Sequence, residues 1–158
     1  MKLRRNAKVE LLRAVPLFSS CTTKELGQIS ALGDELHQPA GSELITEGVK
    51  GREFFVLIEG TVEARRNGRR VATFESGDFF GEIALLTESP RTATVVALTP
   101  VRLLVISGQS FRRLLGDTPS IQGKVSSRLR RLRTIQAAKR IHVSTWRSRV
   151  SGWPAMAR

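Results

Sequence analysis

The sequence is poor in the residues that bind metals and perform covalent chemistry. It contains one cysteine, Cys21, and two histidines, His37 and His142. One cysteine cannot form an internal disulfide, and it fits a reducing compartment such as the cytosol. Two histidines far apart in sequence cannot supply the cluster of His and carboxylate ligands that a metal-binding cupin barrel needs. No HExxH, GxSxG or GxGxxG motif occurs either. We therefore expect no bound metal, no cofactor and no enzymatic activity.

Long apolar runs are also lacking. The longest is Phe54–Ile58, whereas a membrane-spanning helix needs about 20 apolar residues. The basic N-terminus is not followed by the hydrophobic core of a secretion signal. These observations predict a cytoplasmic protein without a transmembrane segment.

Acidic residues are absent after Asp117. Residues 118–158 carry ten of the cations behind the net charge of +12, so the rest of the chain is nearly neutral. Such a basic block has three interpretations: a solvated helix face, contact with nucleic acid phosphates, or contact with an anionic membrane aided by Trp146 and Trp153. We favour the solvated face for Lys124–Arg140.

Hydrophobic periodicity divides the chain into four segments. Residues 1–33 have helical spacing, interrupted at Pro16, and Thr22–Glu25 is a capping-box pattern. Residues 34–107 instead show short apolar runs separated by glycine- and proline-rich turns, which are typical of a β-roll or jelly-roll barrel. Asn67-Gly68 between two such runs predicts a hairpin. The expected strands are 44–46, 54–59, 61–66, 69–74, 93–98 and 101–106.

Helical spacing returns in residues 108–140. We expect a short hinge helix ending near Gly116, and a long lid helix starting near Pro119. The long helix carries one apolar stripe, for which the open mouth of the β-roll is the nearest partner surface: Ile121, Val125, Leu129 and Leu132. Residues 141–158 form a basic tail that we expect to be loosely ordered. The fold class is mainly β with flanking α-helices.

One stretch between the expected strands has the composition of an anion site. Gly81 allows close approach of the backbone to a ligand, and the helix-forming run Glu82–Leu86 would present free amides at its start. Pro90 stiffens the turn that presents Arg91, whose guanidinium can hold a phosphate at two points. A carboxylate at Glu82 would repel that phosphate unless it accepts hydrogen bonds from another group, such as a sugar hydroxyl.

The same stretch resembles the phosphate-binding cassette of the cyclic nucleotide-binding domain family. The resemblance rests on Phe80-Gly81-Glu82-Ile83-Ala84-Leu85-Leu86 and Pro90-Arg91-Thr92-Ala93-Thr94-Val95, and it extends over about residues 11–137. It implies that Arg91 binds the cyclic phosphate and that Glu82 accepts from the ribose 2′-hydroxyl. It also implies that backbone amides complete the cradle within Gly81–Ala93, around Ile83, Ala84, Thr92 and Ala93. Arg52 departs from the family, which often has an acidic residue there.

The resemblance implies a sensor whose ligand is cAMP or cGMP. A hydroxyl at Thr92 can contact the guanine amino group, but many cAMP binders carry Ser or Thr there, and we favour cAMP. Ligand binding would move the C-terminal helices and so regulate an unidentified effector protein or domain. The alternative is a partner-binding adaptor with an unliganded β-roll and a basic docking helix. Only about twenty residues follow Ala138, too few for a helix-turn-helix domain, so no sequence-specific DNA binding is expected.

Overall fold

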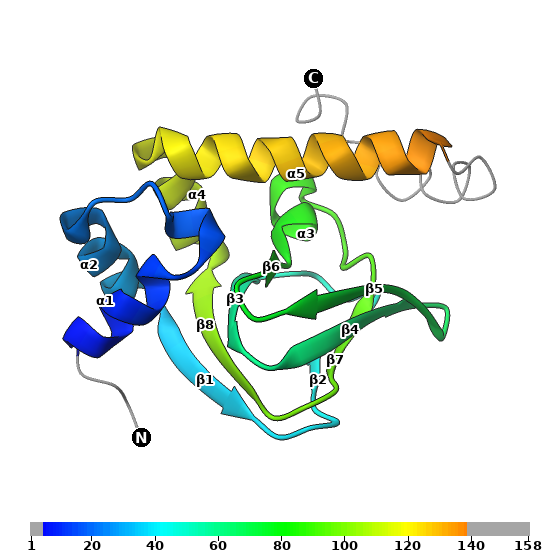
Figure 1. Ribbon diagram of the computed structural model, residues 1–158. Coiled ribbons are helices and arrows are strands. Elements are labelled where there is room, and N and C mark those ends of the chain that lie inside the picture. The colour runs from blue at the N-terminus through cyan, green and yellow to red at the C-terminus, as the bar shows by residue number, and fades with distance from the viewer. Residues whose placement is uncertain (1–4, 139–158) are drawn as a thin grey trace.

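Two four-stranded antiparallel sheets form a β-roll with helices at one side (Figure 1). The computed structural model describes residues 5–138, and the side chains of residues 7–130. The first sheet has the order β1-β8-β3-β6 and the second the order β2-β7-β4-β5. The strands are β1 (Asp34–Gln38), β2 (Glu43–Ile45), β3 (Glu53–Glu59), β4 (Thr61–Arg66), β5 (Arg69–Glu75), β6 (Phe79–Phe80), β7 (Thr94–Ala97) and β8 (Val101–Ser107). This confirms the expected fold class.

The N-terminal helices begin and end where local sequence signals place them. They are α1 (Arg5–Arg13), the 3-10 turn η1 (Pro16–Phe18) and α2 (Thr23–Leu32). Both halves of the capping box are present: the Glu25 amide donates to Thr22 Oγ1 at 3.1 Å, and the Thr22 amide donates to Glu25 Oε1 at 2.9 Å. Pro16 separates α1 from α2, because proline cannot continue a helix from the preceding residue.

The strand pattern was predicted in part. Six strands lie within two residues of the expected runs, and Asn67 (φ 53°) and Gly68 (φ 76°) form the tight turn between β4 and β5. Two strands were missed. The alternation in β1 is weak, because its side chains are at most half-buried. The other is the short β6, where no strand was expected although Phe79 and Phe80 are buried and pair with β3.

The C-terminal helices are α4 (Gly108–Asp117) and α5 (Pro119–Ala138). Ile121, Val125 and Leu129 of α5 are at most 2% exposed, so the apolar stripe is buried as far as the structure describes it. Leu132 lies outside the described side chains, and residues 141–158 lie outside the described chain. The stripe belongs to a cluster that includes Leu12, Phe18 and Leu26 of the N-terminal helices as well as Phe79 and Leu85, so its partner surface is wider than the mouth of the roll that the sequence suggested.

The core consists of two clusters on the two sides of the first sheet. One fills the space between the sheets and includes Phe55, Leu57, Val62 and Phe80. The other joins the outer face of that sheet to the helices, and includes Phe54 and Phe111, whose rings stack at 4.2 Å. Each such ring contributes about 1.5–3 kcal/mol by burial. β6 contributes Phe79 to one cluster and Phe80 to the other, so the chain just after it is held from both sides.

Candidate functional site

Gly81 follows β6 directly and turns the chain into α3 (Glu82–Thr87). Its φ of 93° lies in the left-handed region, which favours glycine. A Cβ atom at this position would lie 3.0 Å from Arg91 Nη1 and 3.1 Å from the Glu53 carbonyl oxygen. Glycine therefore lets the arginine come against the backbone.

Arg91 is held from two sides by main-chain carbonyls. Its Nη1 donates to the Gly81 oxygen at 2.8 Å, and its Nη2 donates to the Glu53 oxygen at 2.6 Å. The side chain is 7% exposed, and burial lowers the pKa of the guanidinium, although Glu53 and Glu82 oppose that shift. A Cβ at Gly51 would lie 2.6 Å from Arg91 Nε, so a second glycine makes room for this side chain. The result is a fixed, buried cation beside α3.

Glu82 is the first residue of α3 and is 3% exposed. Burial raises the pKa of its carboxyl group, while Arg128, a backbone hydrogen bond and Arg91 lower it. The carboxylate is thus removed from water and placed within electrostatic reach of two arginines. A buried acid of this kind is a candidate hydrogen-bond acceptor for a ligand that replaces the lost water.

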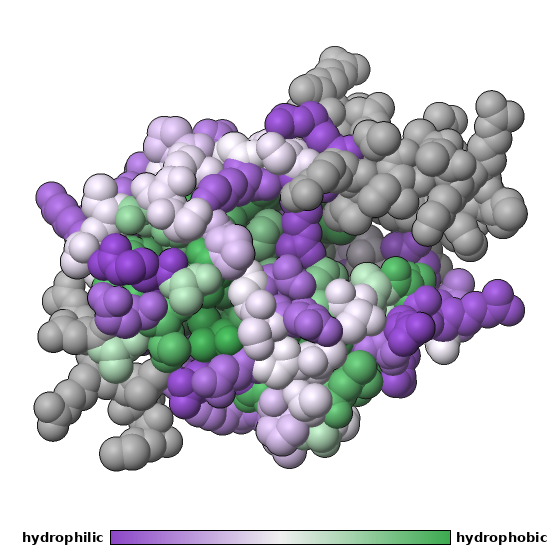
Figure 2. All heavy atoms as spheres, viewed as in Figure 1, coloured by the Kyte–Doolittle hydropathy of each residue, from purple (hydrophilic) through white to green (hydrophobic). Residues whose placement is uncertain are grey.

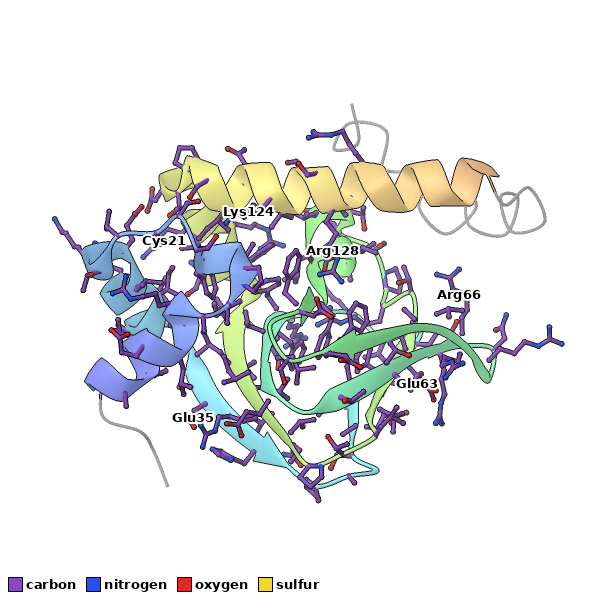
Figure 3. The ribbon with its side chains drawn as sticks, in the orientation of Figure 1. Cys21, Glu35, Glu63, Arg66, Lys124 and Arg128 are labelled. Carbon is purple, nitrogen blue, oxygen red and sulfur yellow. The ribbon has the colours of Figure 1, made fainter. Side chains whose placement is uncertain are left out.

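Arg128 of α5 is the site residue that sequence reasoning missed. Its Nε lies 3.8 Å from Glu82 Oε1, its Nη1 donates to the Phe79 carbonyl oxygen, and its guanidinium carbon lies 4.1 Å from the centroid of the Phe79 ring and 5.1 Å from that of Phe74. The side chain points from the helix into the roll (Figure 3). It is only 17% exposed, so the expected solvated helix face does not extend to Arg128. An arginine placed one helical turn after the buried Val125 and next to the buried Leu129 was the available signal.

The remaining candidate residues lie on the two arms of the same turn. Ala84 is buried in α3, and Ile83, Thr92 and Ala93 are half-buried. The Thr92 carbonyl accepts from Arg66 Nε of β4 at 3.1 Å, which connects this arm to the β4–β5 hairpin. Of the seven residues of the sequence-based site, the structure brings Arg91 against Gly81 and within electrostatic reach of Glu82, while Ile83 and Ala84 lie on α3 and Thr92 and Ala93 follow Arg91 in the chain.

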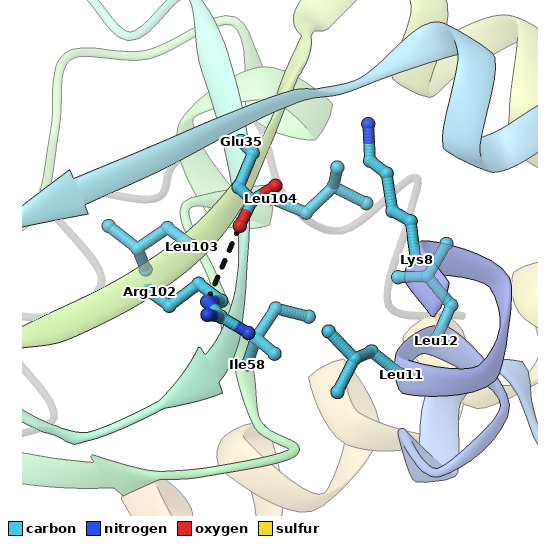
Figure 4. Close-up of a pocket in the computed structure, with 8 residues that line it drawn as sticks. All are labelled: Lys8, Leu11, Leu12, Glu35, Ile58, Arg102, Leu103 and Leu104. Atoms are coloured by element: carbon cyan, nitrogen blue, oxygen red, sulfur yellow. Dashed lines mark ion pairs between the residues drawn. The ribbon is translucent and has the colours of Figure 1, made fainter. Parts of the chain in front are cut away.

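A small cavity lies elsewhere, between α1 and the first sheet (Figure 4). Leu11, Leu12, Ile58, Leu103 and Leu104 form its apolar wall, with Lys8, Glu35 and Arg102 at its edge. Its free space of about 10 Å³ admits one water at most. Lys8 is used structurally, because its Nζ donates to the carbonyl oxygens of Ser30 and Gly33 at the end of α2. This cavity is not a ligand site comparable with the one around Arg91.

Residues 5–138 contain no group of three or more His, Cys, Asp or Glu side chains that could hold a metal ion. Within the same residues, no helix is long and apolar enough to cross a bilayer. Cys21 is buried, and burial is the main cause of its raised thiol pKa.

The sequence profile of the cyclic nucleotide-binding domain matches residues 35–118, which is more than half of the chain. The chain belongs to the cyclic nucleotide-binding domain family. The matched residues include both sheets and all seven candidate residues, and they end at the start of α5.

Known members of the family show what this chain resembles. It is 39% identical over 120 residues to a cAMP-dependent protein kinase regulatory subunit of Aspergillus niger, a match that covers 75% of this chain and 29% of that protein. The cAMP-bound structure of the regulatory subunit PfPKA-R aligns with a TM-score of 0.77 and 27% identity, covering 85% of this chain and 46% of that one. The regulatory subunit of a cAMP-independent protein kinase A from Trypanosoma cruzi, bound to guanosine, aligns with a TM-score of 0.69 and 28% identity, covering 78% and 44%.

Proposed function

We propose that this chain is a regulatory module that binds a cyclic nucleotide, with cAMP preferred over cGMP. The observation that supports it best is the pair Glu82 and Arg91, one acid and one cation buried together on the two arms of a turn in a domain of this family. The structurally similar regulatory subunit PfPKA-R is bound to cAMP, and the Aspergillus niger relative is a cAMP-dependent regulatory subunit. Both support the choice of cAMP.

Arg91 is suited to the cyclic phosphate. Its guanidinium already has two main-chain acceptors, which fix its orientation, so a phosphate would meet a cation that needs little reordering. The interior position strengthens the attraction, because the effective dielectric constant is lower there than in water. Backbone amides around Ile83, Ala84, Thr92 and Ala93 would then donate to the remaining phosphate and ribose oxygens.

Glu82 is suited to the ribose 2′-hydroxyl. Its carboxylate is an acceptor in a position where a phosphate alone would be repelled, and a hydroxyl can donate to it. Both Glu82 and Arg91 are nearly inaccessible in this structure, so a nucleotide can reach them only after something moves. Arg128, which contacts Glu82 from α5, is the group to be displaced.

The module would therefore signal through α5. Ligand entry separates Arg128 from Glu82, and the helix then changes its contacts with the roll. What α5 acts on is an effector protein or domain that remains to be identified. The adaptor with an empty pocket is not favoured, because such a protein has no need of a buried acid and a buried arginine in this arrangement.

Calorimetric titration of the full chain with cAMP, cGMP, adenosine and guanosine tests the proposal. We expect cAMP to bind more tightly than cGMP, and both more tightly than either nucleoside, because only the cyclic nucleotides carry the phosphate. Binding of guanosine without binding of cAMP would contradict the proposal. The ligand preference would then resemble that of the guanosine-bound Trypanosoma cruzi protein.

A further inference from the structure

The tip of the β4–β5 hairpin carries four arginines around a two-residue turn: Arg65, Arg66, Arg69 and Arg70. The hairpin projects from the roll (Figure 1), and hydrophilic side chains gather at its projecting end (Figure 2). Arg69 and Arg70 are exposed, and the Arg65 side chain is 43% exposed. None of these residues belongs to the nucleotide site proposed above.

The strand register places these like charges opposite one another. Arg65 pairs with Arg70 and Arg66 pairs with Arg69 across the two strands. Like charges directly opposite in an antiparallel pair destabilise it. Glu63 lies between Arg65 and Arg70 and offsets part of this cost, but two such pairs in succession still concentrate positive charge at the tip of the hairpin.

Protection of the sheet edge does not explain the cluster. β5 is the edge strand of its sheet, and charges and a bulge there discourage pairing with another chain. β4, however, lies between β7 and β5 and has no free edge. Arg65 pairs with both neighbouring strands, so it protects no free edge.

Neighbouring polar groups contact three of these four arginines. The carboxylate of Glu63, whose side chain is 12% exposed, contacts Arg65 and lies 3.9 Å from Arg70 Nε. Arg66 donates to the Thr92 carbonyl, and the Asn67 amide donates to Glu47 Oε2 at 3.3 Å. Figure 3 shows Glu63 and Arg66 along this hairpin. Such a preordered group of cations loses less side-chain entropy when an anionic partner arrives.

We propose that these four arginines form a docking surface for a short acidic segment of a partner protein. The positive region is small, because the same sheet carries Glu43, Glu63 and Glu75 behind it. A nucleic acid or a membrane presents its charge over a wider area and would meet these carboxylates. Val71, 52% exposed next to Arg70, adds an apolar contact that suits a protein interface, where arginine is also enriched. The described residues include no exposed aromatic side chain on which bases could stack.

A charge-matched pair of variants tests the proposal on the full chain. The probe is a fluorescein-labelled decaglutamate peptide, followed by fluorescence anisotropy at low salt. The variant Arg69→Gln/Arg70→Gln removes two exposed charges and leaves the contact between Arg65 and Glu63 intact. The control Lys24→Gln/Arg113→Gln removes two exposed charges from α2 and α4. We expect the hairpin variant to bind the peptide about five- to tenfold more weakly, as for the loss of two exposed ion pairs, and the control to change binding less than about twofold.

An equal loss in both variants, or none in the hairpin variant, would overturn the proposal. So would hairpin-dependent binding of a DNA duplex or of phosphatidylserine vesicles that is tighter than peptide binding. The melting temperature of the hairpin variant should not fall, since like-charge pairs are relieved. If that variant fails to fold, Arg69→Gln takes its place, with Lys24→Gln as its control and an expected loss of about two- to threefold. Binding of cAMP to both variants is measured separately by calorimetry. If the proposed nucleotide function is wrong, the peptide result still tests the docking surface.

Discussion

Two arginines approach Glu82, one buried and one partly exposed, and they are held in different ways. Arg91 belongs to the same turn as Glu82, and main-chain carbonyls of Gly81 and Glu53 fix it. Arg128 comes from α5 and is held by one carbonyl, two phenylalanine rings and Glu82 itself. The first arrangement persists as long as the roll is folded, whereas the second persists only while α5 stays where it is. Under the proposed function, Arg91 would be the ligand anchor and Arg128 a movable cover.

The largest effect is expected from removing the anchor. Arg91→Ala should weaken cAMP binding by about 2–5 kcal/mol, the range for truncating one side of a buried charge pair. Arg91→Lys should restore only part of this loss, because the planar fork is gone. Calorimetry gives both affinities, and Arg113→Ala on the exposed face of α4 is the control. Unchanged cAMP affinity in Arg91→Ala would place the phosphate elsewhere.

Glu82 should distinguish ribose from deoxyribose. Wild type is expected to prefer cAMP over 2′-deoxy-cAMP by about 1.5–3 kcal/mol, the range for a hydrogen bond to a charged group. Glu82→Ala should largely abolish that preference while keeping some affinity for both, since Arg91 remains. If wild type binds the two analogues equally, Glu82 is not the ribose acceptor and its burial has another cause.

Removal of Arg128 should make nucleotide binding easier, in contrast to removal of Arg91. Arg128→Ala removes the group that contacts Glu82, so a larger fraction of the molecules should be open to the nucleotide. Only molecules with an open site can bind the nucleotide, and the variant increases their fraction. The association rate of a labelled cAMP analogue, measured by stopped-flow fluorescence, should therefore rise about three- to tenfold. Gln122→Ala, exposed on the same helix, should leave it unchanged. A slower association in Arg128→Ala would mean that Arg128 assists entry.

The smallest effect concerns stability and its pH dependence. Because the fold raises the pKa of Glu82 above the ordinary value of 4.5, the folded state favours the protonated acid. The associated cost is absent below the ordinary pKa, and it appears as the pH rises through the raised one. The free energy of unfolding of Glu82→Gln should therefore exceed that of wild type by about 1 kcal/mol near pH 8, because glutamine carries no buried charge. The difference should vanish near pH 4. Urea denaturation at both pH values measures it, and a constant difference would show that burial does not shift this group.

The sequence predicts what depends on neighbouring residues. Turn glycines, the Thr22–Glu25 capping box, the Asn67-Gly68 hairpin and the cassette itself are local patterns, and each lies in the structure where it was expected. β6 was missed because two buried phenylalanines give no alternation to detect. β1 was missed because its outward side chains are all polar or half-buried.

The position of Arg128 beside Leu129 is a sequence signal for its burial, but its partners could not be predicted in this way. Its partners Phe74, Phe79 and Glu82 are distant in sequence, and they meet it only because α5 packs against the N-terminal helices. Sequence patterns offered only the mouth of the roll as a partner for the apolar stripe of α5. The contribution of Leu12, Phe18 and Leu26 was missed because their apolar surface is assembled from two helices and a 3-10 turn.

The arginine Nε–H resonances of the full chain test the distinction between anchor and cover most directly. Nitrogen-15 NMR spectra, with Arg91→Lys and Arg128→Lys used for assignment, report both groups during one cAMP titration. We predict that the Arg91 signal shifts and stays protected from exchange with water, because phosphate joins its carbonyl partners. The Arg128 signal should shift toward the position of an exposed arginine and exchange faster, because Glu82 has been taken by the ribose. An Arg128 signal that keeps its shift and its protection while the Arg91 signal responds to cAMP would contradict the account.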